Sequence, residues 1–250
     1  MRRLLIRPGA LGDFVVSLPA LEDYGGEIWC AAANVPLVRH TAARAISSTG
    51  LDLLELGLAS DEALRGYGEI VSWYGSAREE FRRAVAHLPF RFLPALPDSG
   101  PAHEFYARQL GVKPRAPRLD VPRSACAPYA VIHPYSGSVR KNWPLERFEA
   151  LAARLELPVV WTCGPEETLP ERLPQRRFEN VWDLAVWLGN AALYIGNDSG
   201  PAHLARAAGT PALAIFRDED TPRVWAPAGA TVLIEPTVEQ ALAAVRELRR

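Results

Sequence analysis

One short motif joins several groups that bind phosphate. Asp198, Ser199 and Gly200 follow an apolar strand pattern and precede Pro201, a residue typical of the first turn of a helix. A helix that begins there presents unpaired backbone N–H groups and a partial positive charge, and both favour phosphate. His203 would lie in the same first turn and could face the anion. The pattern therefore indicates a phosphate site, with a capped helix and a buried histidine as the alternative.

A second motif joins small residues to a cation. Ser136, Gly137 and Ser138 follow another apolar strand pattern, where hydroxyls and an uncrowded backbone could approach a ligand closely. Lys141 would add a mobile positive charge for a diphosphate, and it is one of only two lysines among the 28 basic residues. The spacing is not that of a Walker A loop. A surface loop with an exposed lysine is the alternative.

Two further motifs place a carboxylate just after an expected strand. Glu166 follows Gly164, and a carboxylate at the carboxyl end of a strand can accept hydrogen bonds from ribose hydroxyls. A turn with exposed glutamates is the alternative there. Asp13 follows Gly9 and Gly12, which would permit a tight turn from strand to helix. At the helix start, Asp13 could act as a general base or simply cap the helix.

The elements that must position these residues alternate between strand and helix. Short apolar strand patterns recur along the whole chain with helical patterns between them, which favours an α/β fold with parallel sheets. Apolar residues at offsets of three and four predict a helix that begins near Pro144. Thr237 and Gln240 form a capping-box pattern before the last apolar stripe. The predicted strands cover residues 3–7, 27–32, 52–56, 69–73, 91–94, 129–133, 159–163, 193–196, 212–216 and 231–234, and further helices are predicted from about residue 13, after residue 199, and over residues 35–46, 76–87 and 102–110.

The composition of the chain changes between residues 112 and 128, and the helix and strand patterns stop there. This stretch contains four prolines and little periodicity, and proline fixes φ and removes a hydrogen-bond donor. An extended linker is expected there, between a first domain over residues 1–120 and a second over residues 121–250. Two Rossmann-like halves, with parallel sheets that face each other across a cleft, are the expected architecture, and ligands are expected beyond the carboxyl ends of the strands.

Composition excludes several classes of protein. The 250 residues are 48% hydrophobic and 23% charged with a formal net charge of −1, which argues against broad binding to nucleic acid or to an anionic membrane. No apolar run approaches the roughly 20 residues of a membrane span, and the apolar stretch after Met1 is too short for a signal peptide. Three widely separated cysteines predict neither a disulfide framework nor a zinc site. A cytoplasmic protein with reduced thiols is expected.

One acidic cluster has the spacing of a metal-binding sequence. Asp218, Glu219 and Asp220 could be compared with the D-x-D pattern of another transferase fold. They follow a late strand, however, and no further metal ligand is evident nearby. We therefore predict an exposed turn and no metal at the site.

Taken together, the four motifs in this order resemble glycosyltransferase family 9, the bacterial lipopolysaccharide heptosyltransferases. The matching residues are Leu11-Gly12-Asp13 with Pro19, Ser136-Gly137-Ser138 with Lys141-Asn142-Trp143-Pro144, Gly164-Pro165-Glu166, Asp198-Ser199-Gly200-Pro201-Ala202-His203 with Ala207, Gly209 and Pro211, and Arg223-Val224-Trp225-Ala226-Pro227. The resemblance implies a fold of the GT-B type. It also implies that the second domain holds a nucleotide-sugar donor, expected to be ADP-linked, and that the first domain holds the acceptor.

The same resemblance implies roles for individual residues. Asp13 would be the base that deprotonates the acceptor hydroxyl for an inverting displacement, with Gly12 beside it on the acceptor side. Lys141 would bind the diphosphate and offset the charge of the departing nucleotide, and Glu166 would bind ribose. The other residues that would line the donor site are Ser136, Gly137, Ser138, Asp198, Ser199, Gly200 and His203.

A metal-independent, inverting glycosyltransferase is the function that this resemblance implies. It would move a sugar, with heptose as the expected one, from a nucleotide-diphosphate sugar to lipopolysaccharide or another cell-envelope glycan, which can be lipid-linked. The reaction would take place in the cytoplasm, with at most peripheral contact with the inner membrane and with no further cofactor. Two alternatives stay open: a nucleotide-sugar epimerase of the same fold, which needs no acceptor, and a non-catalytic protein that binds a nucleotide sugar.

Overall fold

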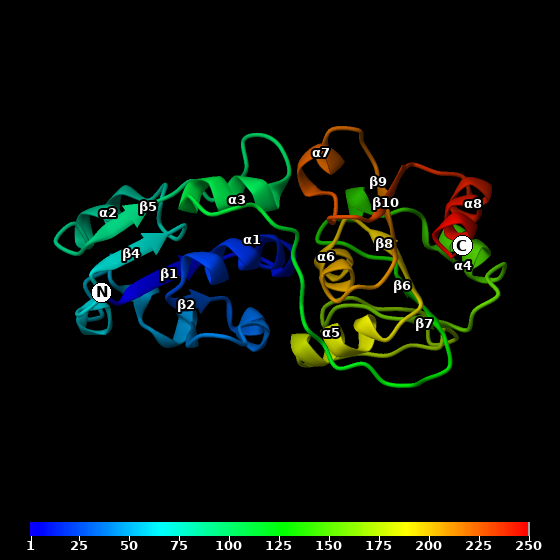
Figure 1. Ribbon diagram of the computed structural model, residues 1–250, viewed down its shortest axis with the longest axis horizontal. Coiled ribbons are helices and arrows are strands. Elements are labelled where there is room, and N and C mark those ends of the chain that lie inside the picture. Colours follow the sequence, from blue (N-terminus) through cyan, green and yellow to red (C-terminus); the bar gives the residue numbers. More distant parts are fainter. Residues whose placement is uncertain (250) are drawn as a thin grey trace. The chain divides into compact units, whose positions relative to one another are not determined.

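The computed structural model describes residues 1–249, which form two compact units (Figure 1). The first unit spans Met1–Arg115 and the second starts at Ala116. Each unit contains one five-stranded sheet, and the strand pairs of both sheets are parallel. The predicted α/β class with parallel sheets is therefore confirmed.

The sheet of the first unit has the strand order β3-β2-β1-β4-β5. The strands are β1 (Arg3–Arg7), β2 (Glu27–Cys30), β3 (Ala43–Ala45), β4 (Glu69–Ser72) and β5 (Phe90–Phe92), and the helices are α1 (Leu11–Tyr24), α2 (Glu79–Ala84) and α3 (Ala102–Leu110). The order of the strands reverses between β1 and β4, and doubly wound sheets bind ligands beyond the carboxyl ends at such a switch point. α1 follows β1 directly and packs against α3.

The helix predicted over residues 35–46 is wrong. A 3₁₀ turn, Ala32–Leu37, and the short edge strand β3 occupy this stretch. Pro36 lies inside the turn, and β3 pairs with β2 from Ile28 to Cys30. The segment therefore satisfies its backbone groups at the edge of the sheet instead of within a helix.

The strand predicted over residues 52–56 is also wrong. A 3₁₀ turn, Leu51–Leu53, and further turns replace it. Leu51 is buried, whereas the side chains of Leu53 and Leu56 are 43% and 63% exposed. A short apolar run does not by itself distinguish a strand from other structures, and here only part of the run reaches the core.

The sheet of the second unit has the strand order β10-β9-β8-β6-β7, so its switch point lies between β6 and β8. The strands are β6 (Ala130–His133), β7 (Val159–Trp161), β8 (Leu193–Asn197), β9 (Ala212–Phe216) and β10 (Thr231–Ile234), and the helices are α4 (Leu145–Ala152), α5 (Val181–Gly189), α6 (Gly200–Ala207), α7 (Thr221–Trp225) and α8 (Val238–Leu248). The sequence patterns did not predict α5 and α7. The capping box of α8 is confirmed, since Thr237 and Gln240 exchange side-chain to backbone bonds of 3.2 and 2.8 Å.

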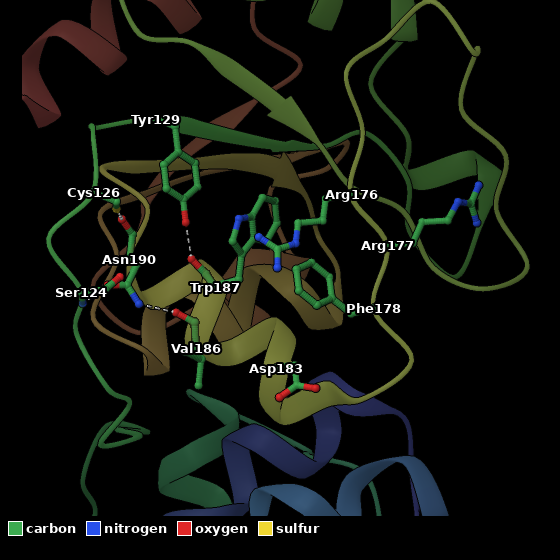
Figure 2. A pocket seen from close by; sticks show the side chains of 10 residues that line it. All are labelled: Ser124, Cys126, Tyr129, Arg176, Arg177, Phe178, Asp183, Val186, Trp187 and Asn190. Carbon is green, nitrogen blue, oxygen red and sulfur yellow. Dashed lines mark hydrogen bonds between the residues drawn. The ribbon is translucent and has the colours of Figure 1, made fainter.

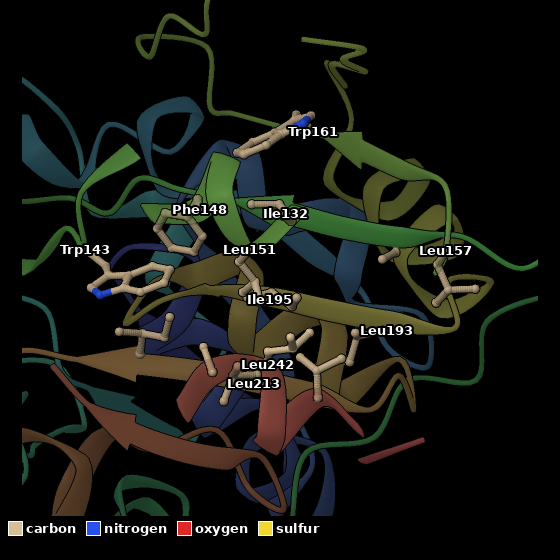
Figure 3. Close-up of a cluster of buried hydrophobic side chains, with 14 of the residues drawn as sticks. Ile132, Trp143, Phe148, Leu151, Leu157, Trp161, Leu193, Ile195, Leu213 and Leu242 are labelled. Atoms are coloured by element: carbon tan, nitrogen blue, oxygen red, sulfur yellow. The ribbon is translucent and has the colours of Figure 1, made fainter. Parts of the chain in front are cut away.

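One hydrophobic core joins α4 and α8 to this sheet (Figure 3). Its members come from both helices and from the central strands, and they include Ile132, Trp143, Phe148, Leu151, Ile195, Leu213 and Leu242. Trp143 is 1% exposed, and its indole Nε1 donates to Pro236 O at 3.0 Å. The loop that carries Lys141 therefore enters α4 through a side chain that is anchored in the core.

The proline-rich stretch contains neither helix nor strand over residues 112–129, as predicted. It is fastened to the second unit by backbone and side-chain bonds. Leu119 N donates to Ala207 O at 2.7 Å, and Asn190 Nδ2 donates to Pro122 O at 3.0 Å. Within residues 1–249, no helix combines the length and the apolar character needed to cross a bilayer.

Candidate functional site

Two loops at the switch point of the second sheet carry most of the predicted donor-site residues. Ser136, Gly137, Ser138 and Lys141 lie in the loop after β6, and Asp198 follows β8. Because β6 and β8 are parallel neighbours, both loops leave the sheet at the same edge. Ligands of doubly wound sheets bind at this edge.

The structure brings Lys141 and Asp198 into contact. Lys141 Nζ donates to Asp198 Oδ2 at 2.6 Å. The Asp198 side chain is 9% exposed and that of Lys141 is 49% exposed, so the cation is fixed by a buried partner and still open to solvent. Lys141 also contributes to the lowered pKa of Asp218, which is held down chiefly by a hydrogen bond from the backbone N–H of Thr221. The lysine thus interacts with carboxylates from the loops after β8 and β9.

A buried amide fixes the span of the Lys141 loop. Asn197, the last residue of β8, is fully buried. Its Nδ2 donates to Pro134 O at 2.6 Å, and its Oδ1 accepts from Trp143 N at 2.9 Å. Pro134 begins the loop and Trp143 lies next to its last residue, so one side chain sets the distance between the two ends of the loop and joins the loop to β8.

The small residues of this loop differ in what they present. Ser136 Oγ lies 2.8 Å from both Ser138 O and Asn142 Oδ1, so its hydroxyl is bound inside the loop. A Cβ atom at Gly137 would meet nothing within 4 Å, so the backbone there is uncrowded. Ser138 occupies the cap position of the 3₁₀ turn that ends at Lys141.

The motif after β8 opens α6 at Gly200, with Pro201 as the second residue of the helix. Ser199 occupies the cap position, but its side chain makes no capping bond, and its Oγ lies 3.5 Å from the hydroxyl of Tyr194. Burial raises the pKa of Tyr194, so the phenol stays protonated. His203 is 5% exposed. The start of α6 therefore rests on buried side chains, and it lies at the same edge of the sheet as Lys141.

Two neighbouring glutamates after β7 have different surroundings. Glu167 Oε2 accepts from Gly164 N at 2.6 Å and lies 3.3 Å from His133 Nε2. Burial raises the pKa of Glu167, but His133, the Gly164 amide and the charge of Arg177 outweigh it and hold that pKa below its ordinary value. Glu166, the residue predicted for ribose, is exposed. Glu167 is thus fixed by the protein, whereas Glu166 faces solvent.

The first unit carries Asp13 as the third residue of α1. The helix begins at Leu11, two residues earlier than predicted, and Ala10 occupies the cap position. Asp13 is therefore not the cap, and its Oδ2 accepts from Ala10 N at 3.2 Å. A carboxylate in the first turn of a helix is favoured by the positive end of the helix dipole, and this turn follows β1 at the switch point of the first sheet.

Gly9 shapes the turn from β1 to α1. Its φ of 123° lies in a region that other residues rarely adopt, and a Cβ atom there would lie 3.2 Å from Asp13 Oδ2. Gly9 O accepts from Nδ2 of Asn34, a buried side chain, at 3.2 Å. Gly12 lies inside α1 as its second residue. Of the two glycines predicted to form the turn, Gly9 is the one whose backbone requires glycine.

A pocket of about 510 Å³ lies beside α5 (Figure 2). Trp187 stacks on Tyr129 with ring centroids 5.7 Å apart, and the Arg176 guanidinium lies 4.9 Å from the centre of the Phe178 ring. The lining residues are Ser124, Cys126, Tyr129, Arg176, Arg177, Phe178, Asp183, Val186, Trp187 and Asn190. They include none of the residues predicted for the donor site. Arg177 links the two regions, since its guanidinium donates to Gly164 O and to Glu167 O at 3.2 and 2.9 Å.

Residues 1–249 contain no group of three or more His, Cys, Asp or Glu side chains placed to hold a metal ion. The acidic cluster over residues 218–220 is an exposed turn before α7, as predicted. Asp218 Oδ1 accepts from Thr221 N at 2.7 Å, and Asp218 Oδ2 accepts from Thr221 Oγ1 at 2.8 Å. These bonds use the carboxylate to close the turn.

Sequence reasoning missed the residues that hold the site together. Asn197, His133 and Glu167 lie within the motifs, but their contacts were not foreseen, and Tyr194 was not singled out at all. A usable signal exists for two of them. His133 ends β6 and Asn197 ends β8, and a polar residue at the carboxyl end of an otherwise apolar strand is expected to have a buried partner.

Comparison with known sequences agrees with this geometry. The model of glycosyltransferase family 9 (heptosyltransferase) matches residues 102–246, which is more than half of the chain. Lipopolysaccharide heptosyltransferase 3 of Escherichia coli strain K12 is 31% identical over 111 residues, which cover 37% of this chain and 31% of that protein. The chain thus matches about a third of the length of this curated relative.

Two solved structures resemble the whole chain. The glycosyl transferase family 9 protein of Veillonella parvula DSM 2008 has a TM-score of 0.77 at 16% identity, over 99% of this chain and 97% of that chain. The ADP-heptose lipopolysaccharide heptosyltransferase II of E. coli has a TM-score of 0.77 at 16% identity, over 100% of this chain and 98% of that chain. These likenesses show a fold of the GT-B type. The family match includes the Lys141 and Asp198 loops, whereas Asp13 lies before it.

Proposed function

Because the chain belongs to glycosyltransferase family 9, we propose that it transfers a heptose from an ADP-linked donor to a lipopolysaccharide or another cell-envelope glycan. The transfer would invert the anomeric carbon and need no metal ion. The names of two similar proteins support the donor and the acceptor class, since one is an ADP-heptose lipopolysaccharide heptosyltransferase and the other a lipopolysaccharide heptosyltransferase. The reaction would take place in the cytoplasm, with at most peripheral contact with the inner membrane.

The observation that carries this proposal is the pair of Lys141 and Asp198 at the switch point of the second sheet, 2.6 Å apart. A diphosphate at this edge would meet a lysine that is already oriented and half exposed, together with backbone N–H groups at the start of α6. Asp198 would keep the ammonium in place and accept from a sugar hydroxyl. Lys141 would offset the negative charge that develops on the departing nucleotide, which is the electrostatic role that a metal ion plays in other enzymes.

The remaining donor-site residues fit parts of the same ligand. Gly137 offers an open backbone beside the diphosphate, with Ser136 and Ser138 shaping the loop around it. Glu166 is exposed and free to accept from ribose, whereas the neighbouring Glu167 is bound to His133 and Gly164. The residues of the α6 opening that would contact the diphosphate and the sugar are Ser199, Gly200 and His203.

Asp13 would supply the base of the reaction. Its carboxylate takes the proton of the acceptor hydroxyl while that oxygen forms a bond to the anomeric carbon. The bond between this carbon and the diphosphate oxygen breaks on the opposite face, and its electron pair leaves with the nucleoside diphosphate. Gly12, next to Asp13 in the first turn of α1, would leave room for the acceptor.

Thermal stability in the presence of nucleotides tests the donor site. A ligand that binds only the folded state raises the unfolding free energy by about 2.7 kcal/mol at 100 times its Kd. We expect ADP to raise the melting temperature more than UDP, GDP, CDP or dTDP, both with EDTA and with Mg²⁺. A rise in melting temperature that needs Mg²⁺ would contradict metal independence. If none of the five nucleotides raised the melting temperature, the proposed donor site would be contradicted.

Incubation with ADP-heptose separates transfer from the two alternatives. A transferase releases ADP in proportion to a glycosylated acceptor and leaves the donor unchanged when no acceptor is present. An epimerase would convert the donor alone into a stereoisomer, which NMR of the sugar protons detects. A binding protein would retain the donor without either change. Product analysis at the anomeric carbon then tests inversion.

A further inference from the structure

A buried arginine lies beneath the turn that carries Asp13. Arg7, the last residue of β1, is 2% exposed. Its four hydrogen bonds all go to uncharged oxygens: Pro8 O at 2.7 Å, Tyr106 Oη at 2.8 Å, and Ser17 Oγ and Asp13 O at 3.1 Å. One guanidinium thus joins the end of β1, the first two turns of α1 and the helix α3.

The positive charge of Arg7 lies in the interior, where it loses its hydration. Burial lowers the pKa of Arg7, and the interactions with Tyr106 and with the Asp13 carboxylate act in the opposite direction. The guanidinium also lies over two aromatic rings, 4.5 Å from the centre of Tyr106 and 5.9 Å from that of Trp73. Since an apolar side chain of similar volume would avoid the desolvation penalty, packing alone does not account for an arginine here.

The Arg7 guanidinium lies against the turn that joins β1 to α1. Arg7 binds the backbone on both sides of Gly9, through Pro8 O before it and Asp13 O after it. A Cβ atom at Gly9 would lie 3.2 Å from Asp13 Oδ2 and 3.5 Å from Arg7 Nη1, so the carboxylate and the guanidinium border one small space. Two contacts thus hold Asp13: its carboxylate accepts from Ala10 N, and its backbone carbonyl accepts from the Arg7 guanidinium.

We propose that Arg7 is the positioning residue of Asp13, with Tyr106 fixing the guanidinium from α3. Arg7 does not touch the substrates in this proposal, which rests on the proposed role of Asp13 as the base. It sets where the first turn of α1 places the carboxylate. Misplacement of a reacting group by about 1 Å can lower a rate about 100-fold, so loosening this turn would lower kcat without changing how the second unit binds the donor.

Two substitutions test the proposal, each with a matched control in the same unit. Arg7→Lys keeps a positive charge but cannot make the forked contacts to Pro8, Asp13 and Tyr106, and we expect kcat to fall about 100-fold. Tyr106→Phe removes one of the four bonds and should lower kcat about 3- to 10-fold. The donor KM should stay within about twofold for both. The controls are Arg115→Lys, which alters an arginine that pairs with Glu22 near the other end of α1, and Tyr24→Phe, which removes a hydroxyl that donates to Glu69.

Hydrogen exchange of the Ala10 amide gives a readout that needs no transfer reaction. Asp13 Oδ2 accepts from this N–H, so Asp13→Ala shows the exchange rate of the unprotected amide. We expect Arg7→Lys to raise the Ala10 rate at least about 10-fold toward this reference, while the amides of α3 exchange as in the parent protein. Tyr106→Phe should have a smaller effect of the same kind, and both controls should have none.

The outcomes separate this inference from the proposed function. Parent-like exchange at Ala10 in both Arg7→Lys and Tyr106→Phe would overturn the positioning role, whether or not transfer is observed. So would parent-like kcat in both variants of an enzyme that Asp13→Ala inactivates. Loss of stability with unchanged kcat per folded molecule would mean that Arg7 is merely structural. If Asp13→Ala still transfers at the parent rate, the base assignment fails instead, and the exchange result still decides whether Arg7 orders the turn.

Discussion

In the second unit the side chains of the candidate site are bonded to one another across neighbouring strands, whereas in the first unit Asp13 is bonded to its own turn. Lys141 and Asp198 come from the loops after β6 and β8. His133 ends β6 and contacts Glu167 in the loop after β7. Asp13 accepts from Ala10, three residues away. The two sheets have equal numbers of strands. The two units differ in the segment that leads from the first strand in chain order at each switch point, β1 or β6, to the next helix.

After β6 the chain forms a loop from Pro134 to Pro144 before α4, and that loop is long enough to carry a lysine back to the next strand end. After β1 only Pro8, Gly9 and Ala10 precede α1, which begins at Leu11, so this turn carries no second charged group. A long loop tied at both ends suits a large ligand such as a nucleotide sugar. A short turn over a buried cation suits one carboxylate that handles one proton. The comparison therefore supports the proposal that the second unit binds the donor and that Asp13 in the first unit takes the proton.

The largest effect is expected from Asp13→Ala, because it removes the proposed base and nothing in the second unit. We expect kcat to fall about 1,000-fold or more, within the range for loss of a general base. The Kd of ADP, measured by titration calorimetry, should stay within about twofold. Asp23→Ala is the matched control, since Asp23 lies on the same helix and pairs with Arg115 at its far end. Transfer at the parent rate by Asp13→Ala would break the division of labour.

A substitution at Asn197 tests the tied loops of the second unit. Asn197→Leu leaves Pro134 O and Trp143 N without their bonds in the interior, so the unfolding free energy should fall by about 2–4 kcal/mol. ADP affinity should fall as well, since the loop that carries Lys141 loses its fixed span. Asn180→Ala is the control: it removes an exposed helix cap and should lower stability by about 1 kcal/mol. Urea unfolding measures both. If both variants lost the same unfolding free energy, the bonds of Asn197 would contribute no more than those of an exposed helix cap.

The same contrast explains what could be predicted from sequence. The strands and the proline-rich linker of the second unit follow from buried apolar runs and from proline chemistry. The errors over residues 35–46 and 52–56 fall in the first unit, where 3₁₀ turns and the short edge strand β3 replace the predicted elements. β3 depends on pairing with β2, and Thr41, just before β3, donates from its Oγ1 to Gly26 O. Local periodicity carries no information about such partners.

The candidate site divides in a similar way. Strand ends with small or charged residues were visible in the sequence, so Lys141, Asp198 and Asp13 were placed beside the correct strands. Their contacts were not visible. Lys141 and Asp198 are 57 residues apart, and they meet because β6 and β8 are neighbours in the sheet. Strand order is a property of the whole unit, and so is the burial of Arg7 against Tyr106.

Removal of the Lys141 charge should weaken the binding of the donor nucleotide without affecting the fold of the first unit. We expect Lys141→Met to raise the Kd of ADP about 10- to 100-fold, as for loss of one charge-assisted hydrogen bond. Asp198 would also lose its partner, which adds a repulsive carboxylate beside the phosphates. Lys113→Met is the control, since it alters the other lysine of the chain, in the exposed linker. Equal Kd values for the two variants would show that Lys141 does not contact the donor.

The smallest effect is expected at the pair of Glu167 and His133, and it should depend on pH. The folded protein holds the pKa of Glu167 below its ordinary value of 4.5, so ionised Glu167 contributes stability above that pH and loses it as the pH falls through the folded pKa. Glu167→Gln should therefore lower the unfolding free energy by about 1–2 kcal/mol at pH 7. The difference from the parent protein should shrink toward pH 3.

Glu166→Gln is the matched control for this measurement, because the neighbouring side chain is exposed and should change stability little at either pH. Urea unfolding at several pH values between 3 and 7 distinguishes the cases. A loss in Glu167→Gln that is constant with pH would mean that the contact with His133 and Gly164 depends on shape and not on charge. A loss that disappears in acid would show that the charge of Glu167 helps to hold the loop after β7 against the end of β6, a contact between neighbouring strand segments that Asp13 in the first unit does not make.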